Sequence, residues 1–130
     1  MANEATINMS LTINKAPLQF LSRPGQFRAD VAVGKGPTPG AFTVTAAGVD
    51  ADLSQLDTPG LCWIQNLDDT EIVEWGIWDG ATFFGVGRLL PTEMALFRLS
   101  EEFSVGTSTN NLRFVSQGAD CFVSVLGFES

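Results

Sequence analysis

The chain has 130 residues, of which 7 are basic and 15 acidic, and its formal charge at pH 7 is -8. Nucleic acids and anionic membranes are bound through Lys and Arg, so this charge argues against both as partners. The chain has no histidine, which removes the commonest general base, the commonest metal ligand and any Ser-His or Cys-His nucleophile pair. We therefore expect no enzyme activity, no metal and no cofactor, and the length predicts a single domain over residues 1–130.

The ends of the chain and its cysteines indicate where it is made. Met1-Ala2-Asn3-Glu4 has neither the positive nor the apolar segment of a secretory signal, and no apolar run approaches the ~20 residues that cross a bilayer. We expect synthesis in a reducing cytoplasm. Cys62 and Cys121 lie in apolar segments without CxxC spacing, which predicts two buried thiols, although a disulfide is possible if their strands pair.

Residues 5–14 alternate between apolar and polar side chains, which predicts a half-buried strand. Its apolar face consists of Ile7, Met9, Leu11 and Ile13. Because this face lies close to a chain terminus, residues 1–16 either form an edge strand of their own sheet or an arm that adds to the sheet of a neighbouring copy. These four residues are therefore candidates for protein contact.

Further strand patterns follow after Pro17, which interrupts the first alternation. A second alternation covers residues 27–33, and the Gly- and Pro-rich residues 34–40 predict a surface loop or a partner-contacting arm. We expect a strand over residues 41–47, and a turn-rich region over residues 48–60 with one short element around residues 53–56.

The second half of the chain predicts more strands. The continuous apolar run Leu61-Cys62-Trp63-Ile64 is typical of a strand covered on both faces. Residues 66–69 predict a turn, and Asp79-Gly80 predicts a hairpin between strands at residues 72–78 and 82–90, with a bulge or a close backbone approach at Gly85 and Gly87. Further strands are expected at residues 94–99, 113–115 and 121–128. Eight to ten short strands without a helical pattern indicate an all-β sandwich or barrel.

The three tryptophans are the candidates for a binding platform. Trp63 and Trp75 lie among apolar residues and are expected in the core, whereas Trp78, beside the Asp79-Gly80 turn, is expected to be exposed. An exposed indole favours protein contact over stacking on a sugar or base. Three arginines lie in or beside strands and are either rim charges of a subunit interface or solvent-facing residues: Arg88, Arg98 and Arg113.

The acidic residues concentrate in the expected turns. They do not have the spacing of an EF-hand, so we interpret them as turn residues that hydrogen-bond their own backbone and not as calcium ligands. The same reasoning excludes a carboxylate pair for glycoside hydrolysis, for which the sequence offers no cleft. The acidic residues concerned are Asp50, Asp52, Asp68, Asp69 and Glu71.

Four segments within residues 58–128 carry a resemblance to a known type of protein. They are Asn66-Leu67-Asp68, Val73-Glu74-Trp75-Gly76, Leu89-Leu90-Pro91-Thr92-Glu93 and Leu96-Phe97-Arg98-Leu99. In these segments the chain resembles small β-sandwich, jelly-roll-like structural proteins of tailed-bacteriophage virions, of the capsid decoration (cement) type. Thr92 stands where the pattern has glycine, and because a β-branched residue resists positive φ we expect a type I turn there.

The resemblance implies a function. It implies a structural virion protein that is made in the host cytoplasm, assembles as a trimer or dimer, and binds the major capsid protein on the outer surface of the shell. Two alternatives stay open. One is a tail- or fibre-associated module that recognises a host glycan through Trp78 and nearby acidic turns, and the other is a ring subunit of the tail or neck.

Overall fold

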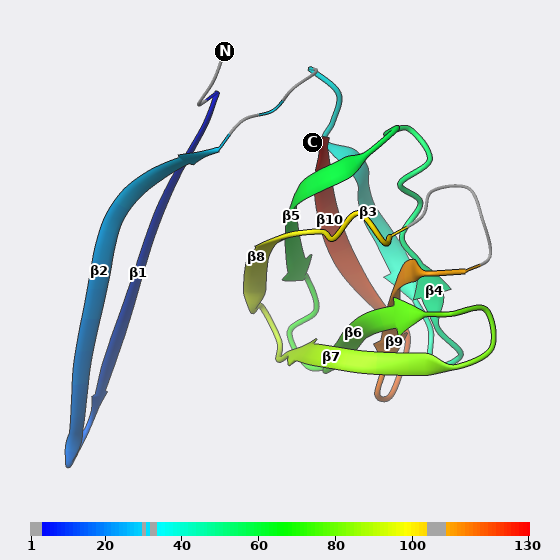
Figure 1. The fold of residues 1–130 in the computed structure, drawn as a ribbon. Helices are drawn as coiled ribbons and strands as arrows, with labels where there is room; N and C mark the ends of the chain where they lie inside the picture. Colours follow the sequence, from blue (N-terminus) through cyan, green and yellow to red (C-terminus); the bar gives the residue numbers. More distant parts are fainter. Residues whose placement is uncertain (1–3, 30, 32–33, 104–108) are drawn as a thin grey trace. The chain divides into compact units, whose positions relative to one another are not determined.

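The computed structural model describes residues 4–29, 31, 34–103 and 109–130, and in these ranges all ten regular elements are β-strands. The predicted all-β class is therefore confirmed. The chain divides into two compact units, residues 1–32 and residues 33–130. Figure 1 shows both units and the labels of their strands.

The first unit is a two-stranded antiparallel hairpin. Strand β1 (Ala5–Lys15) pairs with strand β2 (Leu18–Ala29) along its whole length. The extended arm expected over residues 1–16 is therefore not confirmed. The second alternation, expected over residues 27–33, belongs to the end of β2, and residues 30, 32 and 33 of that prediction lie outside the described residues.

Strand β2 continues through Pro24, where the sequence suggested a break. Between the pairs Met9↔Gly25 and Leu11↔Ser22 the chain advances two residues in β1 and three in β2, so β2 has a bulge of one residue. A bulge leaves one residue outside the hydrogen-bond ladder, which suits a proline because it has no N–H to donate.

The second unit consists of two four-stranded antiparallel sheets. The first has the order β3 (Thr38–Val44), β10 (Cys121–Glu129), β5 (Pro59–Asn66), β8 (Met94–Arg98). The second has the order β4 (Val49–Asp50), β9 (Asn111–Ser116), β6 (Val73–Trp78), β7 (Phe83–Leu89).

The strand pairing of this unit is that of a jelly roll. Its first strand pairs with its last, and the pairing continues inward as β4 with β9, β5 with β8 and β6 with β7. The unit is thus one long hairpin rolled into two sheets, which is the eight-stranded double-sheet arrangement of a jelly roll.

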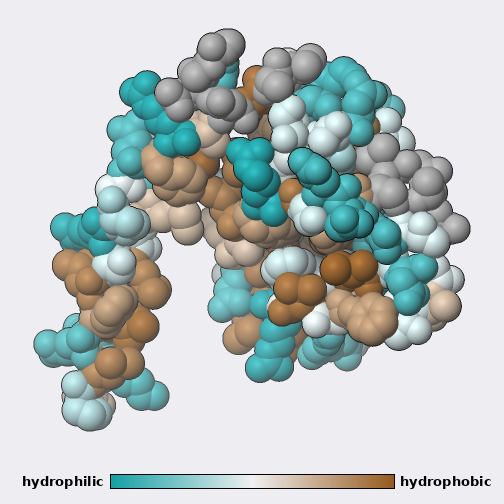
Figure 2. Space-filling model, in the orientation of Figure 1, coloured by the Kyte–Doolittle hydropathy of each residue, from teal (hydrophilic) through white to brown (hydrophobic). Residues whose placement is uncertain are grey.

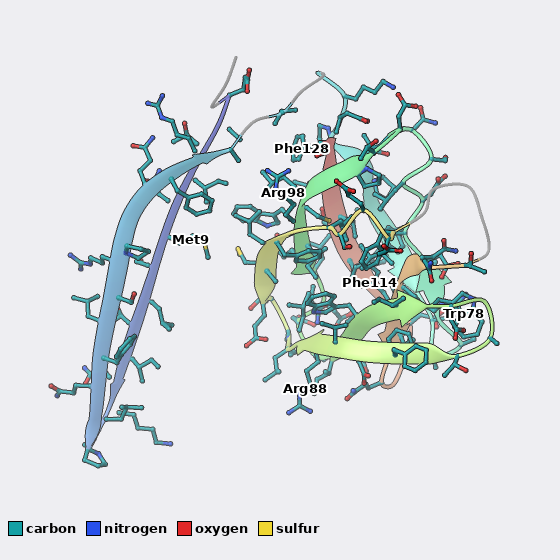
Figure 3. The ribbon with its side chains drawn as sticks, in the orientation of Figure 1. Met9, Trp78, Arg88, Arg98, Phe114 and Phe128 are labelled. Carbon is teal, nitrogen blue, oxygen red and sulfur yellow. The ribbon has the colours of Figure 1, made fainter. Side chains whose placement is uncertain are left out.

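The hydrophobic core lies between the two sheets and draws side chains from both. Phe114 of β9 is fully buried, and its ring meets that of Phe42 of β3 edge to face at 5.9 Å. Figure 3 shows Phe114 pointing into the space between the sheets. The other fully buried core residues of the strands are Val44, Cys62, Ile64, Val73, Leu112, Cys121, Val123 and Val125.

The connection from β4 to β5 also contributes to the core. The short element expected around residues 53–56 is a turn, in which the N–H of Leu56 donates to the carbonyl of Leu53, and the strand lies earlier, at Val49–Asp50. Both leucines are buried. These two leucines form a short apolar pattern in an otherwise polar, acidic connection, because their side chains pack into the core.

Both cysteines are buried and unpaired, as expected. Burial raises the pKa of the Cys62 thiol to about 12 and also raises the pKa of Cys121. Since only the thiolate is a good nucleophile, these residues act as small apolar side chains of the core.

Of the three predicted turns, at residues 66–69, 79–80 and 90–93, the first two have the expected side-chain hydrogen bonds. Asp79 Oδ1 accepts hydrogen bonds from the N–H groups of Ala81 and Thr82, and Gly80 has φ = 103°, so the predicted hairpin turn is confirmed. Asp68 Oδ1 likewise accepts from the N–H groups of Thr70 and Glu71. Acidic side chains in these turns therefore replace missing backbone partners.

The turn at residues 90–93 differs from the expected one. The N–H of Glu93 donates to the carbonyl of Leu90, Pro91 holds the second position, and Thr92 at the third has φ = 67°. Positive φ at the third position is the mark of a type II turn, so the expected type I turn is wrong. The structure keeps the backbone that suits glycine although Thr92 stands there, and β-branched residues rarely adopt this conformation.

Candidate interaction surfaces

The outer face of the β4-β9-β6-β7 sheet is polar and held by its own side chains. Arg113 Nε donates to Asp50 Oδ1 at 2.5 Å, and Asn111 Nδ2 donates to Asp50 Oδ2 at 3.0 Å. The guanidinium carbon of Arg113 lies 3.7 Å from the centre of a Trp78 ring. This arrangement combines an ion pair with a cation–π contact and accounts for Arg113 without a subunit interface.

Trp78 is therefore less accessible than expected. Its side chain is half-buried, because Arg113 covers one face of the indole. Figure 3 shows Trp78 near the end of β6, in the jelly-roll unit, whereas the other predicted contact residues belong to the hairpin.

The outer face of the other sheet has a row of apolar side chains, with Thr43, Ser124, Gln65 and Arg98 at other outward positions. Pro39, Leu126, Trp63 and Leu96 lie in register across all four strands, and side chains two residues apart in a strand share a face. We call this the apolar outer face and define it by Pro39, Leu61, Trp63, Met94, Leu96 and Leu126. Among the outward-facing strand positions of this sheet, all within the described residues, the one charged side chain is Arg98.

Trp63 shows why the prediction for this strand was wrong. The run Leu61-Cys62-Trp63-Ile64 was expected to be covered on both faces, but only Cys62 and Ile64 are buried. Trp63 points outward and is 40% exposed. Trp75, in contrast, packs against the core as expected, with its ring stacked on Phe97 at 4.8 Å and an interplanar angle of 3°.

A second apolar surface covers one face of the N-terminal hairpin. The pairs Ile7↔Phe27, Ile13↔Phe20 and Lys15↔Leu18 place most of the apolar residues of both strands on the same side, whereas Leu21, opposite Thr12, lies on the other side. We call this the hairpin apolar face and define it by Ile7, Met9, Leu11, Ile13, Leu18, Phe20 and Phe27. The opposite side is mostly polar, with Thr6, Asn8, Thr12, Asn14, Gln19, Gln26 and Arg28. Figure 2 shows apolar residues along the hairpin.

The bulge in β2 makes this face continuous. Leu18 and Phe20 occupy even positions and Phe27 an odd one, so a regular strand would place them on opposite sides. The extra residue between Ser22 and Gly25 reverses the alternation and brings all three onto the side of Met9 and its neighbours. A one-residue slip in pairing moves a whole apolar set to the other face, which is why the bulge decides the character of this surface.

The sequence identified only half of the hairpin apolar face. All four residues predicted for protein contact in β1 lie on it: Met9 and Leu11 are 50% and 54% exposed, Ile13 is half-buried, and Ile7 is buried at 7%. Leu18, Phe20 and Phe27 are also about half exposed but were missed, since Pro17 and Pro24 concealed β2. The short alternation Leu18-Gln19-Phe20 was the signal available.

The acidic residues considered as ligands act in turns and pairs. Asp52 Oδ1 accepts from the N–H of Ser54, Asp68 caps its own turn, and Asp50 binds Arg113. Within the described residues, no group of three or more Cys, Asp or Glu side chains is placed to hold a metal ion. The same residues include no helix that is long and apolar enough to cross a membrane.

Arg88 and Arg98 are exposed, and either of the two roles considered for them stays a prediction. Figure 3 shows Arg88 pointing away from the jelly-roll unit. Comparison of the chain with protein-family models, with curated proteins and with solved structures finds no match.

Proposed function

We propose that this chain is a structural virion protein of a tailed bacteriophage, a capsid decoration protein that binds the outer surface of the shell and stabilises it. The observation that carries the proposal is the pair of large apolar sheet faces that lie outside the hydrophobic core. Exposed apolar surfaces of this size are typical of protein–protein interaction sites. The resemblance in residues 58–128 supports the choice of a phage capsid as the partner.

The jelly roll is consistent with this proposal, because the fold occurs in viral structural proteins. It also occurs in lectins and enzymes, so the fold by itself does not decide the function. The distribution of side chains favours assembly. Within the described residues, Asp52, Asp68 and Asp79 accept hydrogen bonds from turn N–H groups, and Asp50 pairs with Arg113.

Strand β7 is the candidate contact with the capsid. It lies at the edge of its sheet, and Phe84 and Val86 are 54% and 61% exposed. An edge strand offers unpaired backbone N–H and C=O groups to another chain. Binding there would stabilise the shell by mass action, since a protein that binds the assembled shell and not its separated subunits shifts the equilibrium toward assembly.

The first experiment measures copy number by quantitative mass spectrometry of purified particles. We expect a copy number comparable to that of the major capsid protein. A copy number as low as that of a single small ring of subunits would instead support the tail or neck alternative. Absence of the protein from the particles would overturn the virion proposal.

The second experiment adds the purified protein to shells that lack it and follows cosedimentation and the temperature of shell disruption. We expect the disruption temperature to rise with protein concentration, and Val86→Glu to weaken binding. Thr82→Glu, in the turn before the same strand, is the control for added charge. A shell that neither binds the protein nor gains thermal resistance would contradict the proposal.

The glycan-binding alternative predicts a different signal. Stacking on Trp78 would change tryptophan fluorescence in a saturable way on titration with the glycan, and Trp78→Ala would abolish that change. A decoration protein gives no such response. The Arg113 side chain that covers one face of Trp78 leaves less of the indole available for a sugar.

A further inference from the structure

We propose that the hairpin apolar face of one copy packs on the apolar outer face of the β3-β10-β5-β8 sheet of a second copy. Both surfaces are described above, and neither takes part in the hydrophobic core of the jelly roll. The contact joins copies of this chain only, so it does not depend on whether the assembly binds a capsid.

The hairpin should be more stable when a partner covers its apolar face. An isolated two-stranded hairpin is marginally stable in water, because it has no third strand or packed face to offset its lost chain entropy. Five side chains of its apolar face are nevertheless about half exposed, namely Met9, Leu11, Leu18, Phe20 and Phe27, although Ile7 is buried. Half of a large apolar side chain is on the order of 100 Å², so these five offer roughly 500 Å². With the polar rim added, this approaches the roughly 800 Å² that each partner of a standard interface buries.

The two surfaces also match in shape and kind. Both are outward faces of antiparallel strands, and such faces pack on each other about 10 Å apart. Strand β1 has 11 residues and is therefore about 37 Å long, at about 3.4 Å per residue. The four strands of the receiving sheet span about 14 Å, at about 4.8 Å between neighbours. The hairpin can thus cross the whole sheet, including the row from Pro39 to Leu96.

Charge favours the hairpin–sheet contact over a contact between two hairpins. Residues 1–32 contain three basic and two acidic side chains, a net charge of +1, whereas residues 33–130 contain four basic and thirteen acidic, a net charge of -9. Two hairpins have no electrostatic attraction for each other. A hairpin and a jelly roll do: the receiving face itself carries Arg98, but Glu93 directly precedes β8, and Glu101 and Glu102 follow it in the sequence.

Each copy has one hairpin that can pack on a neighbouring copy and one sheet face on which the hairpin of another copy can pack. Such head-to-tail contacts form a closed ring when the rotation between copies allows closure, and a trimer is the small ring that we expect. Eight residues separate Ala29 at the end of β2 from Thr38 at the start of β3. Lys35 in this connection is held on the jelly roll by the N–H of Glu129, so residues 30–34 join the two units and, when extended, span at most about 16–18 Å.

The test uses the full chain and one substitution on each surface, with the mass in solution measured by light scattering after size exclusion. Leu11→Glu places a charge on the hairpin apolar face, and Trp63→Glu places one on the apolar outer face. We expect the unaltered protein to be a trimer and each variant to be a monomer. Thr12→Glu, on the polar side of the same hairpin, and Val86→Glu, on the other sheet, are matched controls that should stay trimeric.

Mixing the two monomeric variants is the decisive step. Leu11→Glu retains an intact receiving face and Trp63→Glu retains an intact hairpin, so the mixture should form one-to-one heterodimers. Circular dichroism of each variant checks that the jelly roll is folded. Salt should weaken the association, because it screens the attraction between the units.

Four results would overturn the proposal. A monomeric unaltered protein indicates that the hairpin stays with its own chain or waits for a different partner. Dissociation by Leu11→Glu alone indicates contact between hairpins. A trimer that survives both substitutions places the interface elsewhere. Two monomeric variants that do not associate on mixing exclude the exchange between copies. Any of these can occur in a protein that still decorates shells, so the outcome is independent of the proposed function.

Discussion

The two sheets of the jelly roll have similar inner faces and opposite outer faces. On the outside of β4-β9-β6-β7, Asp50, Arg113 and Trp78 form a chain of polar contacts. On the outside of β3-β10-β5-β8, the row through Trp63 and Leu96 is apolar. Antiparallel sheets ordinarily have one face on the core and a polar face toward water. The first sheet follows that rule and the second departs from it, which motivates the proposed contact with a second copy.

The difference has a consequence for substitutions. Substitution of a residue that makes contacts within its own chain should reduce the stability of the fold. Substitution of a residue that contacts another copy should instead reduce association and leave the stability of the fold nearly unaltered. Substitutions on the two outer faces should therefore have different effects. Substitutions in the core between the sheets should cause the largest loss of stability.

The largest effect is expected in the shared core. Phe114→Ala should lower the free energy of unfolding by about 3–5 kcal/mol, since it removes a fully buried ring and leaves a cavity. Urea denaturation followed by fluorescence measures the change. A loss below about 1 kcal/mol would mean that the two sheets do not depend on this contact.

On the polar outer face, Arg113→Ala should destabilise the protein by about 1–2 kcal/mol. The substitution removes both the ion pair with Asp50 and the contact with Trp78, while the mass of the assembly stays unchanged. Arg88→Ala, at an exposed position of the same sheet, is the control and should have little effect. Equal losses for the two arginines would contradict the role given to Arg113.

In the turn at residues 90–93, which connects the two sheets, replacement of Thr92 by glycine should stabilise the protein. Thr92→Gly is expected to raise the free energy of unfolding by up to about 1 kcal/mol, because glycine adopts positive φ without steric cost but loses more chain entropy on folding. Thr92→Ala keeps the Cβ and should gain less. Thermal unfolding of the three proteins ranks them, and a Gly variant less stable than Thr92 would exclude strain at this residue.

Acid should weaken the turns of the polar sheet. Backbone N–H groups of Thr82 and Ala81 hold the pKa of Asp79 below its ordinary value of 3.8. A group with a lowered folded pKa stabilises the fold above its unfolded pKa, and this contribution disappears as the pH falls through the folded pKa. Stability should therefore decrease below about pH 4, and Asp79→Asn should show a smaller decrease. Melting temperatures at pH 7 and pH 3 measure the difference, and identical pH dependence would remove Asp79 from the explanation.

The smallest effect on folding is expected on the apolar outer face. Trp63→Gln should change the free energy of unfolding of the separated subunit by no more than about 0.5 kcal/mol, as is usual for surface positions. It should nevertheless reduce association, in contrast to Arg113→Ala. Measurement in dilute solution, below the concentration at which copies associate, separates the two effects. A large loss of stability there would show that Trp63 supports its own fold.

Local signals in the sequence were sufficient for much of the secondary structure. Strict alternation at residues 5–14 gave strand β1, and Asp79-Gly80 gave the β6–β7 hairpin, because turn chemistry and period-two patterning act within a few residues. The bulge expected at Gly85 and Gly87 is present, with Trp75 opposite Gly87 and Gly76 opposite Gly85. A Cβ on Gly87 would lie only 3.0 Å from Trp75 Nε1, so a larger residue would crowd the indole.

Misleading local signals explain the errors. Pro17 separates β1 from β2 as predicted, whereas Pro24 suggested a break inside β2, which runs from Leu18 to Ala29 because a bulge tolerates a residue without an N–H. Thr92 suggested a type I turn, but the connection between the two sheets imposes positive φ. In both places the surrounding strands determine a backbone that the residue alone would not favour.

By itself, the sequence determined the all-β class, the approximate strands and the acidic character of the chain, because composition and alternation are properties of neighbouring residues. Tertiary structure decided which faces of those strands are covered. The run around Trp63 is apolar on both sides, and only the pairing of β5 between β10 and β8 shows that Cys62 faces the core and Trp63 faces outward. Likewise, only the register of β1 with β2 places Phe20 and Phe27 on one surface, since the side of a strand is defined by its partner and not by its own residues.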